Sequence, residues 1–157
     1  AGRKALLDSL AALEPLQLLR TEPGAEYRHM LNRIRYFVSA DVGLGEYMAK
    51  NFEAMACGCV LLAWRQGSEE EAIGLKHDEH LLLYSSLDEL REHLARLRRE
   101  PQLAERLARA GQAFVASQLS HEQLAVRLAA VLQEPWPRLP VASRWQRFCS
   151  LFKPRRG

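Results

Sequence analysis

The chain has 157 residues, of which 48% are hydrophobic and 26% are charged, and its formal net charge is +3. This length and balance predict a globular protein with one domain of ordinary size, and no stretch approaches the roughly 20 apolar residues that a membrane-spanning helix needs. Six basic residues and no acidic residue follow Glu134, which leaves a charge of −3 on residues 1–134. Because a nucleic-acid-binding protein carries its basic residues across the folded body, we expect no nucleic-acid partner.

Cysteine usage and the N-terminal residues bear on the compartment. The three cysteines, Cys57, Cys59 and Cys149, are an odd number, and two of them lie too close together for an easy disulfide. The opening "AGRKALLDSL" lacks the hydrophobic middle and cleavage site of a signal peptide. We therefore expect a cytoplasmic protein. The chain opens on Ala inside a helix-like segment, so we also expect an N-terminally truncated domain.

The first half of the chain alternates helix and strand patterns. The expected elements are a helix over 3–13, a strand over 16–19, a helix over 26–34 and a strand over 35–40, whose "RYFVSA" is aromatic and β-branched. A glycine-bearing loop, "DVGLGEYM", then leads into a short helix around Phe52. Gly58 is expected to end that helix, because glycine accepts the left-handed conformation of a helix terminus.

Two further apolar strands and several helices follow. "CVLLAW" (59–64) and "HLLLYS" (80–85) are continuous apolar runs typical of buried strands. Ser86 with Glu89, and Ser120 with Gln123, have the spacing of capping boxes. Pro101 suits the first turn of a helix over about 102–117.

Helices that alternate with unbroken apolar strands predict an α/β fold, a Rossmann-like parallel sheet flanked by helices, with a helical C-terminal region. We place the domain at residues 1–134 and a basic amphipathic tail at residues 135–157. Ligands of such sheets bind at the carboxyl ends of the strands. The loop over 41–49 follows one of those ends and is therefore the expected site.

The stretch "KNFEAMACG" (50–58) begins at this loop and carries chemistry suited to a nucleotide. The start of a helix attracts phosphate through its free N–H groups and its dipole, and Lys50 would add a point charge for a diphosphate. Glu53, one turn later, is able to accept two hydrogen bonds from the diol of a ribose. Gly43 and Gly45 would let the main chain approach a ligand closely. The alternative is an ordinary buried helix, in which Lys50 reaches solvent and Glu53 caps the first turn.

The same residues carry a family resemblance. From about Tyr27, through "NRIRYFVSADVGLGEYMAKNFEAMACGCVLLAW", to "SLDELREHL", the chain resembles the C-terminal, donor-binding half of GT-B-fold glycosyltransferases of group 1, in their spore-maturation-type branch. The resemblance implies a hexosyltransferase-like enzyme that moves a sugar from a nucleotide-diphosphate sugar to a glycan, lipid or protein acceptor. It implies ribose binding by Glu53 and diphosphate binding by Lys50, with Gly43, Gly45 and Asn51 also in the donor site.

The chain also departs from that family. Many relatives have two glutamates separated by seven residues; the first would fall at Gly45, and Glu46, one position later, is the candidate for contact with the sugar. GT-B enzymes have two Rossmann-like domains, and we expect the N-terminal acceptor domain to be missing from this chain. We therefore expect that domain as a partner, little activity from this fragment alone, and no assignable catalytic residue.

Two alternatives remain open: a non-catalytic nucleotide-binding module and a dinucleotide-dependent oxidoreductase fragment. "GLGEYM" followed by "SEEE" has the layout of a dinucleotide-binding turn and its ribose-binding acid, but Met48 replaces the third glycine. "HDEH" (77–80) has no further ligands nearby, so we expect no metal site. We expect no cofactor beyond the sugar-nucleotide substrate.

The basic tail has its own pattern. In "SRWQRFCSLFK" (143–153), Trp145, Phe148, Leu151 and Phe152 fall on one helical face between cationic flanks. Such a helix suits either peripheral contact with an anionic membrane, on the inner face of the cell membrane, or docking on the missing N-terminal domain.

Overall fold

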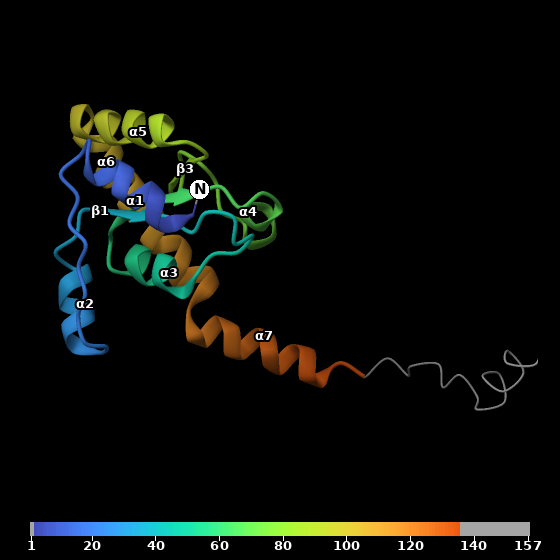
Figure 1. Cartoon of the computed structure of the whole chain (residues 1–157). Coiled ribbons are helices and arrows are strands. Elements are labelled where there is room, and N and C mark those ends of the chain that lie inside the picture. The colour runs from blue at the N-terminus through green and yellow to red at the C-terminus, as the bar shows by residue number, and fades with distance from the viewer. Residues whose placement is uncertain (1, 136–157) are drawn as a thin grey trace, which may run out of the picture. The chain divides into compact units, whose positions relative to one another are not determined.

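The computed structural model describes residues 2–135 and shows a parallel three-stranded sheet surrounded by helices (Figure 1). The chain divides into two compact units, residues 1–123 and 124–157. The first unit holds the sheet, and α7 begins in it and continues into the second. The elements are α1 (Arg3–Ala11), α2 (Ala25–Leu31), β1 (Tyr36–Ser39), α3 (Ala49–Ala56), β2 (Val60–Trp64), α4 (Ser68–Ile73), β3 (Leu82–Tyr84), α5 (Leu87–Arg99), α6 (Pro101–Phe114), a π-helical turn (Val115–Leu119) and α7 (His121–Gln133).

The sheet confirms the predicted α/β, Rossmann-like class. Its strands follow the order β1-β2-β3 and are all parallel, with Tyr36 opposite Val60 and Leu62 opposite Leu82. Each strand comes from one of the unbroken apolar runs, because a parallel strand is covered on both faces and has no solvent side that would need polar residues. Helices or loops connect the strands, as parallel pairing requires.

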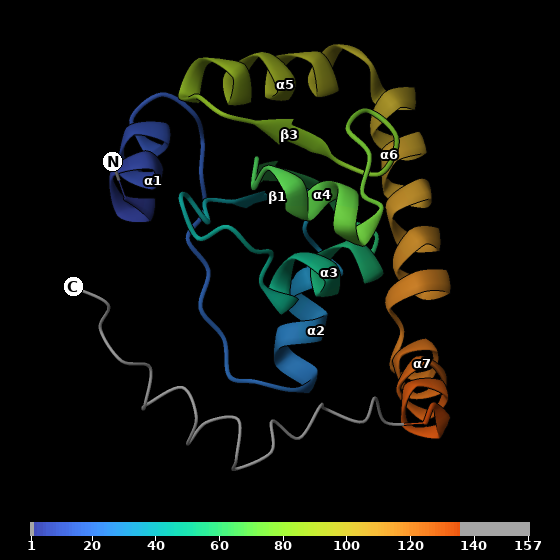
Figure 2. The same ribbon diagram turned by 90° about the vertical axis from the view of Figure 1, so that its right-hand side faces the viewer.

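Side chains of β2 alternate between two cores. Val60 and Leu62 pack with the α1 and α5 side chains, including Leu94, whereas Leu61 packs with Met55 of α3 on the opposite face. Figure 2 shows α5 and α3 on opposite sides of the strands, with α6 running past the end of the sheet. The site loop over 41–48 is anchored to the second of these cores through Tyr47.

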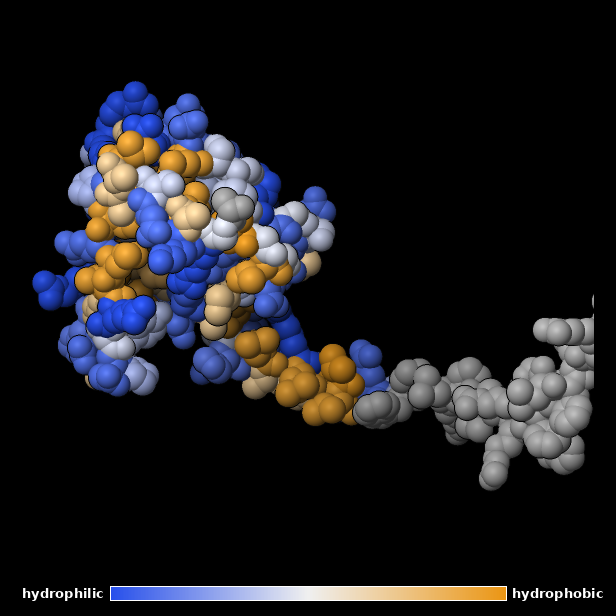
Figure 3. Space-filling view, in the orientation of Figure 1, coloured by the Kyte–Doolittle hydropathy of each residue, from blue (hydrophilic) through white to orange (hydrophobic). Residues whose placement is uncertain are grey.

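The predicted strand over 16–19 is wrong. This segment is irregular, and among the described residues it forms no main-chain hydrogen bond with β1, the neighbouring edge of the sheet. Leu18 and Leu19 are 67% and 50% exposed, and apolar surface is visible on the side of α1 and α2 in Figure 3. The segment has the composition of a strand but has no hydrogen-bonded partner strand.

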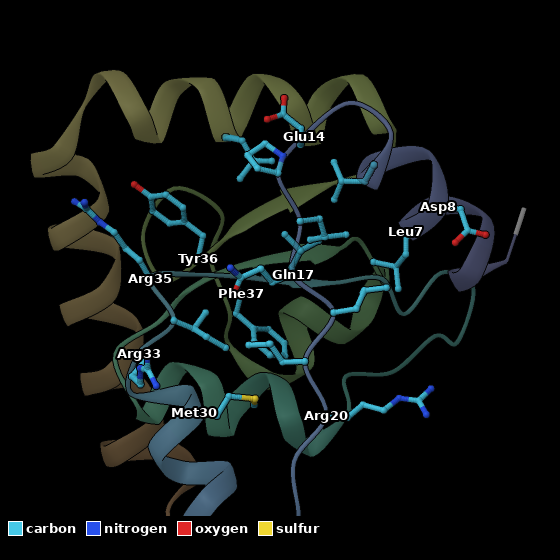
Figure 4. Close-up of a pocket in the computed structure, with 18 of the residues that line it drawn as sticks. Leu7, Asp8, Glu14, Gln17, Arg20, Met30, Arg33, Arg35, Tyr36 and Phe37 are labelled. Carbon is cyan, nitrogen blue, oxygen red and sulfur yellow. The ribbon is translucent and has the colours of Figure 1, made fainter.

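A cavity of about 990 Å³ lies between this segment and β1. Figure 4 shows Gln17 from the segment and Tyr36 and Phe37 from β1 among its lining side chains. The carbonyl oxygen of Arg35 accepts a hydrogen bond from the Val60 N–H on the β2 side. Because hydrogen bonds alternate in direction along a strand, the main chain of Tyr36 and that of Val38 point towards this cavity.

The opposite edge of the sheet is capped by two histidines. Nδ1 of His77 accepts the N–H of Leu83 at 2.9 Å, and Nε2 of His93 lies 3.0 Å from the carbonyl oxygen of Leu83. The two rings lie 5.4 Å apart between centroids. The main chain of β3 at Leu83 is therefore satisfied by imidazoles in place of a further strand.

Helix boundaries agree in part with the predicted capping signals. Ser86 accepts the Glu89 N–H at 3.1 Å, while the Glu89 carboxylate accepts the N–H of Ser85 rather than that of Ser86. Ser120 accepts the N–H of Gln123 at 3.3 Å. Gly58, with a φ of +79°, follows the end of α3, as predicted. Helix α4 was not expected from the sequence.

None of the helices described within residues 2–135 has the length and apolar composition needed to cross a membrane. The predicted amphipathic helix over 143–153, with its membrane or protein contact, lies outside the described residues.

The histidine cap predicts a pH dependence of stability. Nδ1 of His77 accepts a hydrogen bond only when it carries no proton, and burial lowers the pKa of His77, with Asp78 opposing that effect. Because the folded state then binds a proton less readily than the unfolded state, the stability that this bond contributes is complete above the ordinary histidine pKa of about 6.5 and is lost as the pH falls below it, towards the lowered pKa of the folded state. We expect urea unfolding to show lower stability at pH 5.5 than at pH 7.5.

The variant His77→Gln keeps a hydrogen-bond acceptor without a titrating group, so its loss of stability between these pH values should be smaller. His29→Gln, at an exposed histidine on α2, serves as the control and should behave like the unmodified chain. An identical pH dependence in all three proteins would contradict the assigned role of His77.

Candidate functional site

The loop between β1 and α3 lies at the carboxyl ends of the strands, where the sequence placed the site. Gly43 and Gly45 have φ angles of +73° and +72°, which suit glycine, and both are exposed. The N–H of Gly45 donates to Oε1 of Gln66 at 2.9 Å, and Nε2 of Gln66 donates to the carbonyl oxygen of Asp41 at 2.7 Å. The loop that follows β2 therefore fixes the glycine loop from one side.

Asp41 is the centre of the polar groups at this edge. Its side chain is 1% exposed and its Oδ1 accepts a hydrogen bond from Nζ of Lys50 at 2.7 Å. Its Oδ2 accepts hydrogen bonds from the Ser39 hydroxyl at 2.7 Å and from Nδ2 of Asn51 at 3.3 Å. Burial alone would raise the pKa of Asp41, but these hydrogen bonds and the charge of Lys50 lower it below the ordinary value. Asp41 is therefore a carboxylate at neutral pH.

A second cation approaches the same oxygen. Nη1 of Arg3, at the start of α1, lies 3.8 Å from Oδ1 of Asp41, and the Arg3 side chain is 56% exposed. The Lys50 side chain is 21% exposed. Both cations thus keep part of their surface towards solvent, and the three groups together carry a charge of +1.

The start of α3 adds a partial positive charge. Met48 occupies the N-cap position in an extended conformation, and its side chain gives no hydrogen bond to the first turn. That turn contains no acidic residue, and Lys50 lies in it. The N–H groups and the dipole at this helix end therefore meet no anionic side chain of the first turn.

Glu53 lies one turn further along α3 and faces a different neighbour. Its Oε2 accepts a hydrogen bond from the Tyr27 hydroxyl of α2 at 3.0 Å, and its side chain is exposed. Partial burial, followed by this hydrogen bond and the charge of Glu53, raises the pKa of Tyr27 to about 12. Among the described residues Glu53 forms no ion pair with Lys50, and its Oε1 remains available as an acceptor.

The other predicted residues have contrasting positions. Asn51 is fully buried; its Nδ2 donates to Asp41, and its Oδ1 is buried without a hydrogen-bond partner among the residues that the structure describes. Glu46 is exposed in the glycine loop. The structure therefore gathers Lys50, Asn51 and the glycine loop around Asp41, while Glu53 lies beside α2 and Glu46 faces solvent.

Sequence reasoning missed three of the residues that organise this edge. Asp41 lies two residues after the end of β1, and a polar residue just beyond the carboxyl end of a parallel strand is itself a signal. Gln66 follows β2 in the same way. Arg3 gave no signal, because only the tertiary structure brings α1 to this edge.

A buried carboxylate also lies behind the loop. Oε1 of Glu70 in α4 accepts hydrogen bonds from the Tyr47 hydroxyl at 2.8 Å and from the N–H of Gln66 at 2.7 Å, while its Oε2 is buried without a partner. Burial and the bond to Glu70 raise the pKa of Tyr47. This pair fixes α4 against the site loop and explains a helix that the sequence pattern did not predict.

The cavity beside β1 is not lined by any of the predicted site residues. Arg3 is the lining residue that also lies beside Asp41. Across residues 2–135 no three histidine, cysteine, aspartate or glutamate side chains are grouped as metal ligands would be. His80, the last residue of the "HDEH" segment, has protein contacts instead: its Nδ1 lies 3.3 Å from the backbone nitrogen of Lys76, and its ring stacks on Phe114.

Comparison with known proteins gives a family. No curated protein matches the chain significantly. A family model described as glycosyl transferase-like matches residues 15–130, which include the sheet, the glycine loop and α3. The match covers well over half of the chain, and we conclude that the chain belongs to the glycosyl transferase-like family.

Proposed function

We propose that this chain is the donor-binding domain of a glycosyltransferase of the GT-B type, group 1, in the spore-maturation-type branch that its sequence resembles. Its donor would be a nucleotide-diphosphate sugar and its acceptor a glycan, lipid or protein. The observation that carries the proposal is the convergence of Arg3 and Lys50 at the uncapped start of α3. Family membership supports sugar transfer as the reaction.

The diphosphate fits the charge at the start of α3. Phosphate oxygens accept hydrogen bonds from the N–H groups of a helix end, and the helix dipole favours their negative charge. Lys50 has three N–H donors, of which Asp41 uses one. The remaining donors and the exposed guanidinium of Arg3 are free to meet the diphosphate. As the sugar leaves, this positive charge would stabilise the departing nucleoside diphosphate.

The ribose fits beside Glu53. Residues three positions apart lie on one face of a helix and are separated by roughly 4.5 Å along its axis. A ligand with its diphosphate at Lys50 would therefore reach Glu53 with the adjoining sugar ring. The free Oε1 of Glu53 would accept a ribose hydroxyl while Oε2 keeps its bond to Tyr27. Glu46 in the exposed glycine loop is the candidate for contact with the transferred sugar.

Binding of the acceptor belongs to a second domain in the two-domain enzymes that this chain resembles. We propose that such a domain is the partner with which this chain completes an active site, and that the isolated chain binds the donor without transferring sugar. A nucleotide-binding module without catalysis would share the site and differ only in lacking such a partner.

Titration calorimetry of the 157-residue chain tests the ligand class. We expect binding of UDP or GDP and none of NADH, because the proposed site is built for a diphosphate and one ribose. Lys50→Ala should lower the affinity for the diphosphate about tenfold, since a hydrogen bond to a charged group contributes on the order of 1.5 kcal/mol. Lys76→Ala, at a lysine that pairs with Glu79, is the matched control and should bind normally. Binding of NADH without either diphosphate would reject the proposal.

The role of Glu53 is tested separately by comparing two variants. Glu53→Ala should weaken binding of the nucleoside diphosphate several-fold, because the ribose loses its acceptor. Tyr27→Phe removes the same hydrogen bond but leaves the carboxylate, and it should bind as the unmodified chain does. Both variants should melt within a few degrees of the unmodified chain, since the bond is exposed. Equal loss of binding in both variants would assign Glu53 to the packing of α2 instead.

A further inference from the structure

Asp41 presents a problem of charge. A buried carboxylate lies at the place where, on the proposed function, an anionic diphosphate binds, and like charges repel. In the structure this repulsion is offset, because donors of the site surround the carboxylate. Both lone-pair faces of Asp41 are directed at donors of the site: Oδ1 faces Lys50 and Arg3, and Oδ2 faces Ser39 and Asn51. Its charge is therefore fully engaged by neighbouring donors.

The main chain of Asp41 fixes a second part of the site. Its carbonyl oxygen accepts Nε2 of Gln66, and Oε1 of Gln66 accepts the N–H of Gly45. The same residue thus holds the first turn of α3 through its side chain and the glycine loop through its carbonyl. No other residue described within 2–135 bonds to both Lys50 and Gln66.

We propose that Asp41 is the positioning residue of the diphosphate site. It holds the ammonium of Lys50 at the start of α3 before the ligand arrives, so that little side-chain freedom is lost on binding. Lysine has three donors, so Lys50 is able to keep its bond to Asp41 while the other two N–H groups meet the diphosphate. This inference rests on the proposed function and assigns to Asp41 a role that acts through Lys50.

Removing the charge of Asp41 should change the affinity for the diphosphate in opposite directions, depending on whether Asp41 positions Lys50 or competes with the ligand for it. If Asp41 only competed with the ligand for Lys50, removing its charge would free the ammonium and strengthen binding. If Asp41 positions Lys50, removing its charge leaves a mobile lysine and weakens binding. Asparagine has nearly the shape of aspartate and keeps the main-chain bond to Gln66, so Asp41→Asn tests the charge with small disturbance of the fold.

The experiment is a double-mutant cycle of the whole chain, with UDP and GDP as probes in calorimetry. Asp41→Asn should weaken the better of the two ligands about tenfold. In the Lys50→Ala background the same change should have less than a twofold effect, because the group through which Asp41 acts is absent. Asp88→Asn, at an exposed aspartate in α5, is the control and should change nothing.

Three results would overturn the inference: tighter binding by Asp41→Asn, unchanged binding, or an undiminished effect in the Lys50→Ala background. In each of these the unmodified chain still binds its diphosphate, so the proposed function stands. If the unmodified chain binds neither UDP nor GDP, the proposed function falls, and this inference falls with it.

A second measurement decides the matter if Asp41→Asn does not fold. The side-chain ammonium of Lys50 is followed by ¹⁵N NMR in the unmodified chain. We expect a slowly exchanging Lys50 signal in the free chain, and a shifted but still protected signal when UDP or GDP is bound. A Lys50 signal that exchanges as fast as that of Lys76 in the free chain would overturn the inference.

Discussion

The ion pair between Asp41 and Lys50 is the interaction on which the rest of the site depends. Asp41 is almost wholly removed from water, and a charge in that position is costly unless it is paired and hydrogen-bonded. Side chains from α1, β1 and α3 therefore converge on its carboxylate, while Gln66, from the loop that follows β2, bonds to its main-chain carbonyl. The need to pair one buried carboxylate with donors therefore determines where these side chains lie at the edge of the sheet.

That edge collects positive charge from three sources. Lys50 brings an ammonium, Arg3 brings a guanidinium, and α3 brings the positive end of a helix whose first turn has no acidic residue. The parallel sheet accounts for the place of α3, which begins after the carboxyl end of β1, whereas Arg3 reaches the same edge through the packing of α1. Membership of the glycosyl transferase-like family is consistent with a site of this charge.

Much of the fold was readable from the sequence. The runs that became β1, β2 and β3 are apolar throughout, and burial on both faces is the physical reason for that pattern. The segment over 16–19 has a similar composition but finds no hydrogen-bonded partner strand in the described part of the chain, and composition does not reveal whether such a strand is present. Helix α4 was missed because its position depends on the bond between Glu70 and Tyr47, which is distant from Glu70 in sequence.

The site was predicted only in part, because sequence spacing shows local motifs but not tertiary contacts. Lys50 and Glu53 stand in a local motif at a helix start, which sequence spacing is able to show. The same spacing did not show that Lys50 pairs with Asp41 or that Glu53 bonds to Tyr27, since both contacts are tertiary. Asn51 shares the motif yet is fully buried and bonds to Asp41.

The central claim is that the start of α3, with Lys50 and Arg3, binds a diphosphate. Its most direct test is a titration of the ¹⁵N-labelled chain with inorganic pyrophosphate, followed by NMR. The largest shifts should occur at the amides of Ala49 and Lys50 and at the guanidinium of Arg3, and they should saturate. Shifts that stay small there while the arginines of α5 and α6 respond would contradict the account.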